Sequence, residues 1–175
     1  MPRLSSGYGA CVLSRVAEEP VMQIAEVMTP GPICCTPDTS VAEAARLMWE
    51  ADCGVLPVVN GRTLTGVVTD RDLFIALATR DLRASELTVG SVARAMPVTC
   101  TPRDDVQQAM GKMKTHRVRR LPVVDKDGTL VGIVSMNDLL LTIAPESATG
   151  GKVVDTLQTI SEHHLPVPAA RAAAV

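Results

Sequence analysis

An internal duplication constrains the fold of this 175-residue chain more than any other feature. The first copy begins at Thr36 and reads TPDTSVAEAARLMWEADCGVLPVVNGRTLTGVVTDRDL; the second begins at Thr101 and reads TPRDDVQQAMGKMKTHRVRRLPVVDKDGTLVGIVSMNDL. Matching residues are 65 positions apart through Pro57 and Pro122, and 66 apart after one extra residue in the second copy, within VVDKDGTLVG. A length change of this kind is typical of a turn, so we expect two halves with the same local structure.

Each copy predicts the element order β-α-β-β-α. Short strands are expected to begin near Ile33 and Val98 and to end at a Thr-Pro pair, because proline cannot continue a β-ladder. Apolar residues at helical spacing follow each pair and predict one amphipathic helix per copy. LPVV and the β-branched run after the next turn predict a hairpin, and a second helix is expected to begin near Arg71 or Met136.

Segments outside the duplicated core complete the predicted organisation. Further helices are expected at residues 21–28, 89–96 and 152–161. The predicted parts are a flexible N-terminal segment at 1–20, a first repeat at 21–85, a second repeat at 86–145, and a C-terminal helix and tail at 146–175.

Composition indicates a globular domain and argues against several classes of partner. Hydrophobic residues make up 46% of the chain and charged residues 21%, which is ordinary globular usage. The net charge is −2 and only three residues are aromatic, so neither a broad positive field nor base stacking is available to nucleic acid. Apolar runs are too short to span a membrane. We therefore expect no nucleic-acid partner, no membrane partner and a cytoplasmic location.

The two segments with the clearest candidates for ligand binding are GVVTDRD (66–72) and GIVSMND (132–138). Each places a hydroxyl, Thr69 or Ser135, and an acid, Asp72 or Asp138, at the start of a predicted helix. A carboxylate can accept both hydrogen bonds from a ribose diol, and the hydroxyl and free helix amides can bind a phosphate or a sugar oxygen. The alternative is a simple capping box with the acid at its third helical position. The repetition in matched copies favours ligand binding.

Together these motifs resemble a tandem pair of cystathionine-β-synthase-type (CBS) domains, or Bateman module, over roughly residues 22–145. The resemblance is carried by VMTP at 27–30, the related RAMP at 94–97, the two Thr-Pro pairs, LPVV twice and G-h-h-[ST]-x-x-D twice, where h is hydrophobic. It implies an α+β fold: two β-α-β-β-α repeats packed about a pseudo-twofold axis, with extra N- and C-terminal helices. It also implies clefts between the repeats that often bind adenine nucleotides, in modules that are usually regulatory.

The resemblance assigns ribose binding to Asp72 and Asp138, and hydroxyl contacts to Thr69 and Ser135. The remaining ligand-binding candidates are apolar residues that also suit the core. These are Ile33, Val55, Pro57, Val67, Val98, Pro122 and Ile133.

A basic pair, Arg119 and Arg120, lies directly before the second LPVV, where nucleotide-binding members of the family often carry phosphate ligands. In such modules, basic residues at this position commonly bind the phosphates of a nucleotide whose ribose is held by the acid of the other repeat. We therefore predict that the nucleotide prefers the Asp72 cleft, with Arg71 as a further cation. Strand alternation sends Arg119 and Arg120 to opposite faces, so at least one of them should reach the ligand.

The five cysteines are odd in number and form no CxxC pair, which fits neither a disulfide framework nor a usual zinc site. Cys35 and Cys100 occupy equivalent positions and suit small buried hydrophobes. A redox role for the vicinal Cys34 and Cys35, or for Cys53, stays open. His163 and His164 lack the partner spacing of a metal site. No nucleophile–base constellation or phosphate-binding glycine loop is present, so we expect no enzyme activity.

These observations predict a non-catalytic cytoplasmic module that requires no cofactor and binds AMP, ADP or ATP as a regulatory ligand. Its output would pass to an unidentified protein partner through a population shift. We also expect a homodimer, for which Trp49 is a candidate anchor. The alternative is a redox-responsive or structural scaffold that acts through its cysteines and dimer interface without nucleotide.

Overall fold

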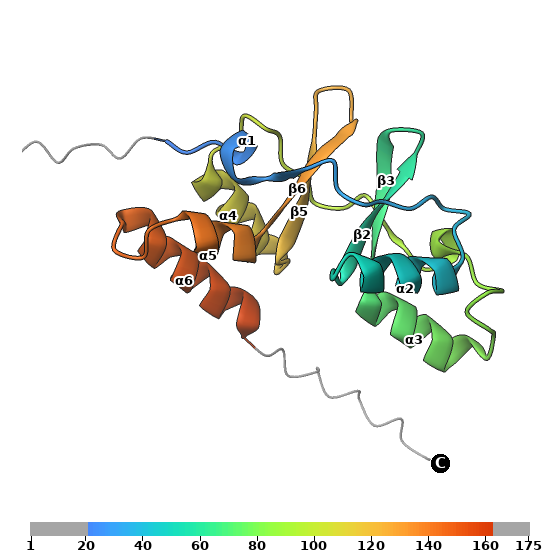
Figure 1. Ribbon diagram of the computed structural model, residues 1–175. Helices are drawn as coiled ribbons and strands as arrows, with labels where there is room; N and C mark the ends of the chain where they lie inside the picture. The colour runs from blue at the N-terminus through green and yellow to red at the C-terminus, as the bar shows by residue number, and fades with distance from the viewer. Residues whose placement is uncertain (1–20, 163–175) are drawn as a thin grey trace, which may run out of the picture.

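Two three-stranded sheets with helices packed against them form the two halves of the molecule (Figure 1). The structure is a computed structural model that describes residues 21–162. Its elements are α1 (Ile24–Val27), β1 (Thr29–Pro30), α2 (Val41–Glu50), β2 (Val55–Asn60), β3 (Thr63–Thr69), α3 (Asp70–Arg80), the 3-10 helix η1 (Val89–Ser91), β4 (Arg94–Ala95), α4 (Val106–His116), β5 (Arg120–Val124), β6 (Leu130–Ser135), α5 (Met136–Thr142) and α6 (Ala148–Ser161). The predicted α+β class and tandem arrangement are confirmed.

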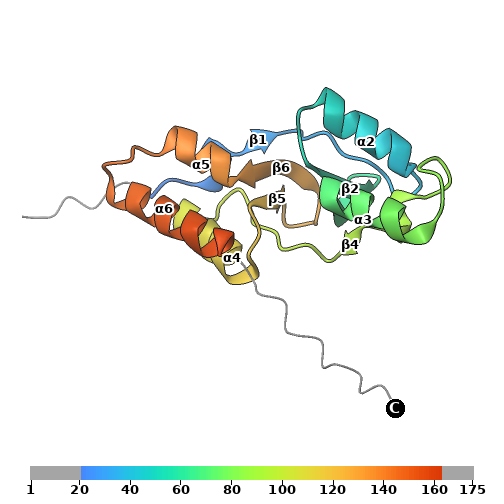
Figure 2. The same ribbon diagram turned by 90° about the horizontal axis from the view of Figure 1, so that it is seen from below.

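Each half is built on an antiparallel hairpin, in which burial alternates towards the end of β3 and β6 but runs through consecutive residues of β2 and β5. The first sheet has the order β2-β3-β4 and the second the order β1-β6-β5. Both hairpins carry a register shift at matching positions, between Val58 and Val59 and between Val123 and Val124. Helices α2 and α3 cover the first sheet, and α4 and α5 cover the second (Figure 2). This equivalence extends the sequence repeat to the level of packing.

The halves exchange their entry segments. Although α1 and β1 precede the first repeat in the chain, β1 pairs with β6, and Ile24 and Val27 belong to the core of the second half. Reciprocally, β4 pairs with β3, and Leu87 and Val89 belong to the core of the first half. The predicted boundary at 85/86 therefore divides the sequence repeat, whereas the spatial halves each contain the other repeat's first segment.

The two hairpin tips also contact each other. The Leu64 amide donates to the Gly128 carbonyl oxygen at 3.1 Å, and the Leu130 amide donates to the Arg62 carbonyl oxygen at 2.9 Å. Together with the exchanged segments, these bonds fix the halves against one another.

Several predicted elements differ in the structure. The prediction of strands near Ile33 and Val98 is wrong. Each segment forms only one parallel bridge, Cys35 with Val58 and Cys100 with Val123. The helix expected at 89–96 is also wrong, since a three-residue 3-10 helix gives way to β4, which pairs with β3. In the second case, pairing with a strand of the other repeat overrides local sequence preference.

Two predicted helices exist with different bounds. The first is only the single turn Ile24–Val27, closed by a capping box between Gln23 and Glu26. The last begins at Ala148 rather than at 152, because the Ser147 hydroxyl caps it by accepting from the Gly150 amide. The sequence predicts a later start because Gly150 and Gly151, which lie in the first turns, are poor helix formers.

The glycine that opens each GhhSxxD-type motif permits the exchange. A Cβ at Gly66 would lie 2.8 Å from the Arg94 carbonyl oxygen of β4. A Cβ at Gly132 would lie 2.6 Å from Met28 Sδ and 3.1 Å from the Thr29 carbonyl oxygen. Only a residue without a side chain therefore lets the entry strand approach this closely.

Gly66→Ala should lower the free energy of unfolding by about 1 to 3 kcal/mol, because the added methyl group would push β4 away from β3. Gly111→Ala in α4 is the matched control: a Cβ there meets open space, and alanine suits a helix better by about 0.5 to 1 kcal/mol. Urea denaturation measures both. Equal stability of the two variants would contradict the requirement for close approach.

Candidate ligand-binding site

The two predicted acid–hydroxyl pairs form capping boxes at the starts of α3 and α5. The Asp72 amide donates to Thr69 Oγ1 at 3.1 Å, while Asp72 Oδ2 accepts from the Thr69 amide and hydroxyl at 3.2 and 2.7 Å. The Ser135 pair is the same: Asp138 Oδ2 accepts from the Ser135 amide and hydroxyl at 2.7 and 2.8 Å. Capping thus uses one oxygen of each carboxylate and leaves the other available.

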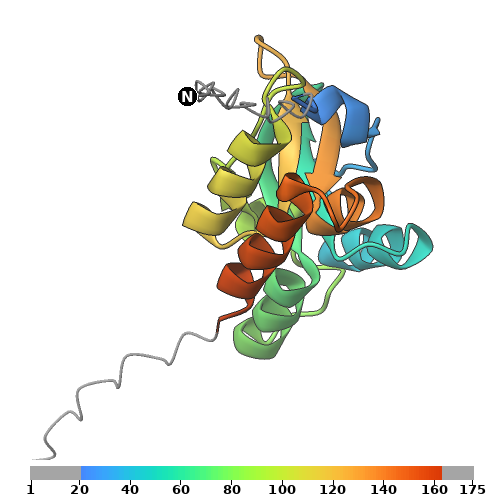
Figure 3. The same ribbon diagram turned by 90° about the vertical axis from the view of Figure 1, so that its left-hand side faces the viewer.

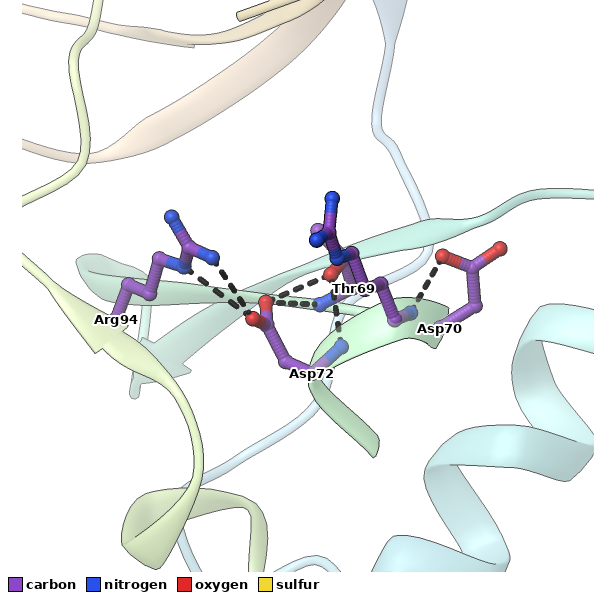
Figure 4. Close-up of polar contacts among 5 residues, drawn as sticks. Thr69, Asp70, Asp72 and Arg94 are labelled. Carbon is purple, nitrogen blue, oxygen red and sulfur yellow. Dashed lines mark hydrogen bonds and ion pairs between the residues drawn. The ribbon is translucent and has the colours of Figure 1, made fainter. Parts of the chain in front are cut away.

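The remaining oxygens of the two acids have different surroundings. Asp72 Oδ1 accepts from Arg94 Nη2 at 3.0 Å and from Nε at 3.3 Å (Figure 4). Within the described residues, Asp138 Oδ1 has no hydrogen-bond partner. Burial alone would raise the pKa of Asp72, but the hydrogen bonds from Thr69 and Arg94 outweigh it and lower that pKa below its ordinary value.

Asp138 lies in a cleft of about 410 Å³ that both halves line. This volume falls in the range of small-molecule sites. The second half contributes Arg120, Ile133, Ser135 and Asp138; the rest of the lining is Thr29, Gly31, Pro32, Ile33, Ala51, Asp52, Cys53, Val55 and Pro57. A carboxylate, a hydroxyl and a guanidinium therefore meet apolar strand residues in one cavity.

The structure brings together about half of the predicted site residues. Those that line the Asp138 cleft are Ile33, Val55, Pro57, Arg120, Ile133, Ser135 and Asp138. Thr69, Val67 and Asp72 lie together in the first half, beside β4. Arg71 is exposed, with its amide bonded to Asp70.

The basic pair divides between two environments. Arg120 lines the Asp138 cleft because β5 pairs antiparallel with β6, which sets Arg120 opposite Ser135 in the same half. Arg119 points to the other side, where its Nη2 lies 3.5 Å from the Ser161 hydroxyl of α6. The predicted alternation holds, but the placement of Arg120 beside Asp138 differs from our expectation that it serves Asp72.

Two of the remaining apolar candidates have roles in the second half's packing. Pro122 is buried, and its carbonyl oxygen accepts from the Cys100 amide at 3.1 Å. Val98 is partly buried and packs against the same core.

Sequence reasoning missed the cleft residues contributed by the entry segment and by the loop after α2. The residues of the entry segment could have been found by continuing the repeat offset of 65 towards the N-terminus. With this offset, residues 27–32 align with 92–97, and Thr29 aligns with Arg94. The comparison of VMTP with RAMP made above is therefore two residues out of register. Strand pairing confirms the offset, because Thr29 pairs with Ile133 and Arg94 with the equivalent Val67.

The equivalent cysteines are structural in character. Cys35 and Cys100 are buried, and burial raises the pKa of each thiol to about 11. Cys34 is exposed and Cys53 is half-buried. Within residues 21–162, no group of three or more His, Cys, Asp or Glu side chains is placed to hold a metal ion. Cys11, His163 and His164 lie outside the described residues.

No helix within the described part of the chain has both the length and the apolar character needed to cross a membrane.

Comparison with known proteins gives two matches to the CBS domain family, at residues 24–79 and 89–145. The CBS domain-containing protein YhcV of Bacillus subtilis is 31% identical over 132 residues, which are 75% of this chain and 93% of YhcV. An inosine-5'-monophosphate dehydrogenase of Korarchaeum cryptofilum is 36% identical over 107 residues, 61% of this chain but only 21% of that enzyme.

Solved structures show the same fold with adenosine-containing ligands. CBSX2 of Arabidopsis thaliana in complex with AMP has a TM-score of 0.61 at 29% identity, covering 69% of this chain and 94% of CBSX2. The CBS domain pair of protein MJ0100, in complex with 5-methylthioadenosine and S-adenosyl-L-methionine, has a TM-score of 0.63 at 26% identity, covering 69% of this chain and 94% of that one. With both repeats matched by sequence and structure, the chain belongs to the CBS domain family as a tandem CBS pair.

Proposed function

We propose that the chain is a non-catalytic regulatory module that binds an adenine nucleotide of the AMP, ADP or ATP type in the Asp138 cleft. The observation that carries this proposal is Asp138, whose Oδ1 has no hydrogen-bond partner among residues 21–162 and which lines a cavity together with Arg120. The AMP complex of CBSX2 and the adenosyl ligands of MJ0100 support an adenosine-containing ligand.

The cleft offers a partner for each part of a nucleotide. Asp138 accepts from ribose hydroxyls, and the Arg120 fork suits a phosphate. Val55 and Ile133 provide apolar surface for the base. Because the cleft uses both halves, a bound nucleotide favours the arrangement in which they close on it, and this population shift is the signal.

A path from the cleft to the surface exists in the loop after α2. Asp52 and Cys53 line the Asp138 cleft and also a groove of about 520 Å³ between α2 and α3. A ligand that moves this loop therefore alters the groove. We propose that the altered groove changes the assembly of the chain and that a protein partner detects this change, in the cytoplasm and without a further cofactor.

The groove between α2 and α3 is also our proposed homodimer interface. In the second half, α6 lies against α4 and α5 and seals the equivalent surface (Figure 3). Lys114 of α4 donates to Asp155 of α6 at 2.7 Å, whereas the equivalent Trp49 of α2 is 86% exposed. Phe74, 72% exposed, faces the same groove. A second copy offers the same apolar surface and can cover both residues by twofold symmetry.

The redox-scaffold alternative receives less support. Thiolates are the reactive form of cysteine, and burial with a raised pKa keeps Cys35 and Cys100 protonated. A scaffold would also leave Asp138 Oδ1, which has no hydrogen-bond partner within the described residues, without a role.

Asp138→Asn should weaken binding of AMP by about 1.5 to 3 kcal/mol, because it removes a charged acceptor. Asparagine can still accept the capping bonds, so the helix start is retained. Isothermal titration with AMP, ADP, ATP, NAD and S-adenosylmethionine measures the loss and identifies the tightest ligand. A larger loss in Asp72→Asn would instead support our original preference for the Asp72 cleft.

Arg120→Ala should lower the affinity for ATP and AMP by a similar amount, since the guanidinium binds phosphate by charge-assisted hydrogen bonds. Arg119→Ala is its matched control, because this neighbour is equally basic but points toward α6. The same titration applies. Equal losses in both variants would indicate a general electrostatic effect and contradict a specific role for Arg120.

Phe74→Glu should convert a dimer into a monomer, because a buried unpaired carboxylate is costly at an interface. Leu141→Glu is the control: Leu141 is 88% exposed on α5, away from the groove. Size-exclusion chromatography with light scattering reads the mass directly. A Phe74→Glu protein with unchanged dimer mass would rule out this interface.

Cys35 and Cys100 should stay unmodified by iodoacetamide at pH 8 in the folded protein, while Cys34 is alkylated. A pKa of about 11 leaves only a small fraction of each buried thiol as thiolate. Peptide mass spectrometry before and after unfolding in urea locates the labels. Rapid labelling of Cys35 in the folded state would revive the redox alternative.

A further inference from the structure

The two capping acids are equivalent in sequence and geometry, yet their hydrogen-bonding capacity differs. An ionised carboxylate has about four acceptor positions, two on each oxygen. At Asp72, two are used by Thr69 and two by Arg94 Nε and Nη2. At Asp138, the two on Oδ2 are used by Ser135, and those on Oδ1 are free within the described residues. Only one acid can therefore accept from a ribose without first losing a partner.

The difference arises from one pair of equivalent residues. Arg94 on β4 and Thr29 on β1 occupy the same register, opposite Val67 and Ile133 respectively. Arg94 reaches from β4 across to the start of α3, where its guanidinium meets Asp72 (Figure 4). Thr29 lines the Asp138 cleft with a side chain too short to do the same.

The exposure of the ion pair shows which partner lies outermost. The Asp72 side chain is 10% exposed and the Arg94 side chain 71%. The acid is thus set into the protein while the guanidinium covers it from the solvent side. A ribose approaching Asp72 meets Arg94 first.

We propose that Arg94 closes Asp72 to nucleotide, so that the choice of threonine or arginine at this strand position decides which of the two equivalent acids binds ribose. The inference rests on the proposed function, because it assumes that the acids bind ribose. It makes the chain a single-site sensor, in which its own Arg94 keeps Asp72 from binding ribose.

The strength of the closure follows from its exposure. Exposed ion pairs contribute at most about 1 kcal/mol, which corresponds to about a fivefold change in an equilibrium constant. The ion pair alone therefore accounts for a weakening of up to about fivefold, and exclusion of the ribose by the guanidinium adds to it, so we expect Arg94 to weaken binding at Asp72 by about fivefold or more.

The test exchanges the two residues and uses AMP as the probe in isothermal titration. Asp138→Asn weakens the main site, so that a gain in binding at Asp72 can be measured in this background. Adding Arg94→Thr to this variant should tighten AMP binding at least fivefold, and adding Asp72→Asn as well should abolish the gain. In the otherwise unchanged chain, Thr29→Arg should weaken AMP binding at least fivefold by closing the Asp138 cleft. Thermal melts of each variant establish that it is folded.

The outcomes separate the two proposals. If the unchanged chain binds AMP through Asp138 but Arg94→Thr yields no gain in the Asp138→Asn background, the closure by Arg94 is wrong and the proposed function stands. If Arg94→Thr weakens binding in that background, Arg94 is a phosphate ligand and the closure is again wrong. If neither the unchanged chain nor any variant binds AMP or another adenosyl ligand, the proposed function fails and the closure with it.

Discussion

The close crossing of an entry strand over a hairpin glycine is the constraint on which the rest of this structure depends. At Gly66 and Gly132 the added strand passes within a distance that a Cβ atom would occupy. Because β1 and β4 each complete the sheet of the opposite half, neither half has its full sheet without the other repeat. The same crossing carries Thr29 and Arg94 to the acids of the GhhSxxD-type motifs, so the cleft chemistry is set by segments that lie outside the repeat's most similar part.

The capping boxes show how structure and binding can share a residue. One carboxylate oxygen is enough to close the start of a helix, and a short helix such as α5 gains from it. The second oxygen is then held in a fixed direction at low cost in side-chain entropy, which is favourable for recognition. The choice between a capping-box acid and a ligand-binding acid, posed by the sequence, is therefore not exclusive. Asp138 completes its capping box and has a second oxygen without a hydrogen-bond partner among the described residues, whereas Asp72 completes its capping box and is paired with Arg94.

Sequence reasoning could reach the features that depend on local pattern. The duplication, the hairpins and the capping acids follow from spacing and turn chemistry, and all are present. It failed where the opposite half decides the conformation: the segment at 89–96 reads as a helix but pairs with β3, and Arg120 could be assigned to a cleft only once its strand partner was known. Arg94 was visible in the aligned repeat but unremarkable, since nothing local indicates that its side chain reaches Asp72.

The asymmetry of the two halves gives the duplicated fold a division of roles. The second half has the open acid, and its helical face is sealed by α6, where Val153 is buried. The first half has the closed acid, and its helical face exposes Trp49 and Phe74. The loop that contains Asp52 and Cys53 lines both the Asp138 cleft and the groove between α2 and α3. Under the proposed function, a nucleotide bound against the second half would act on the exposed face of the first through this one short segment, which a symmetric pair with two open acids and two sealed faces could not do.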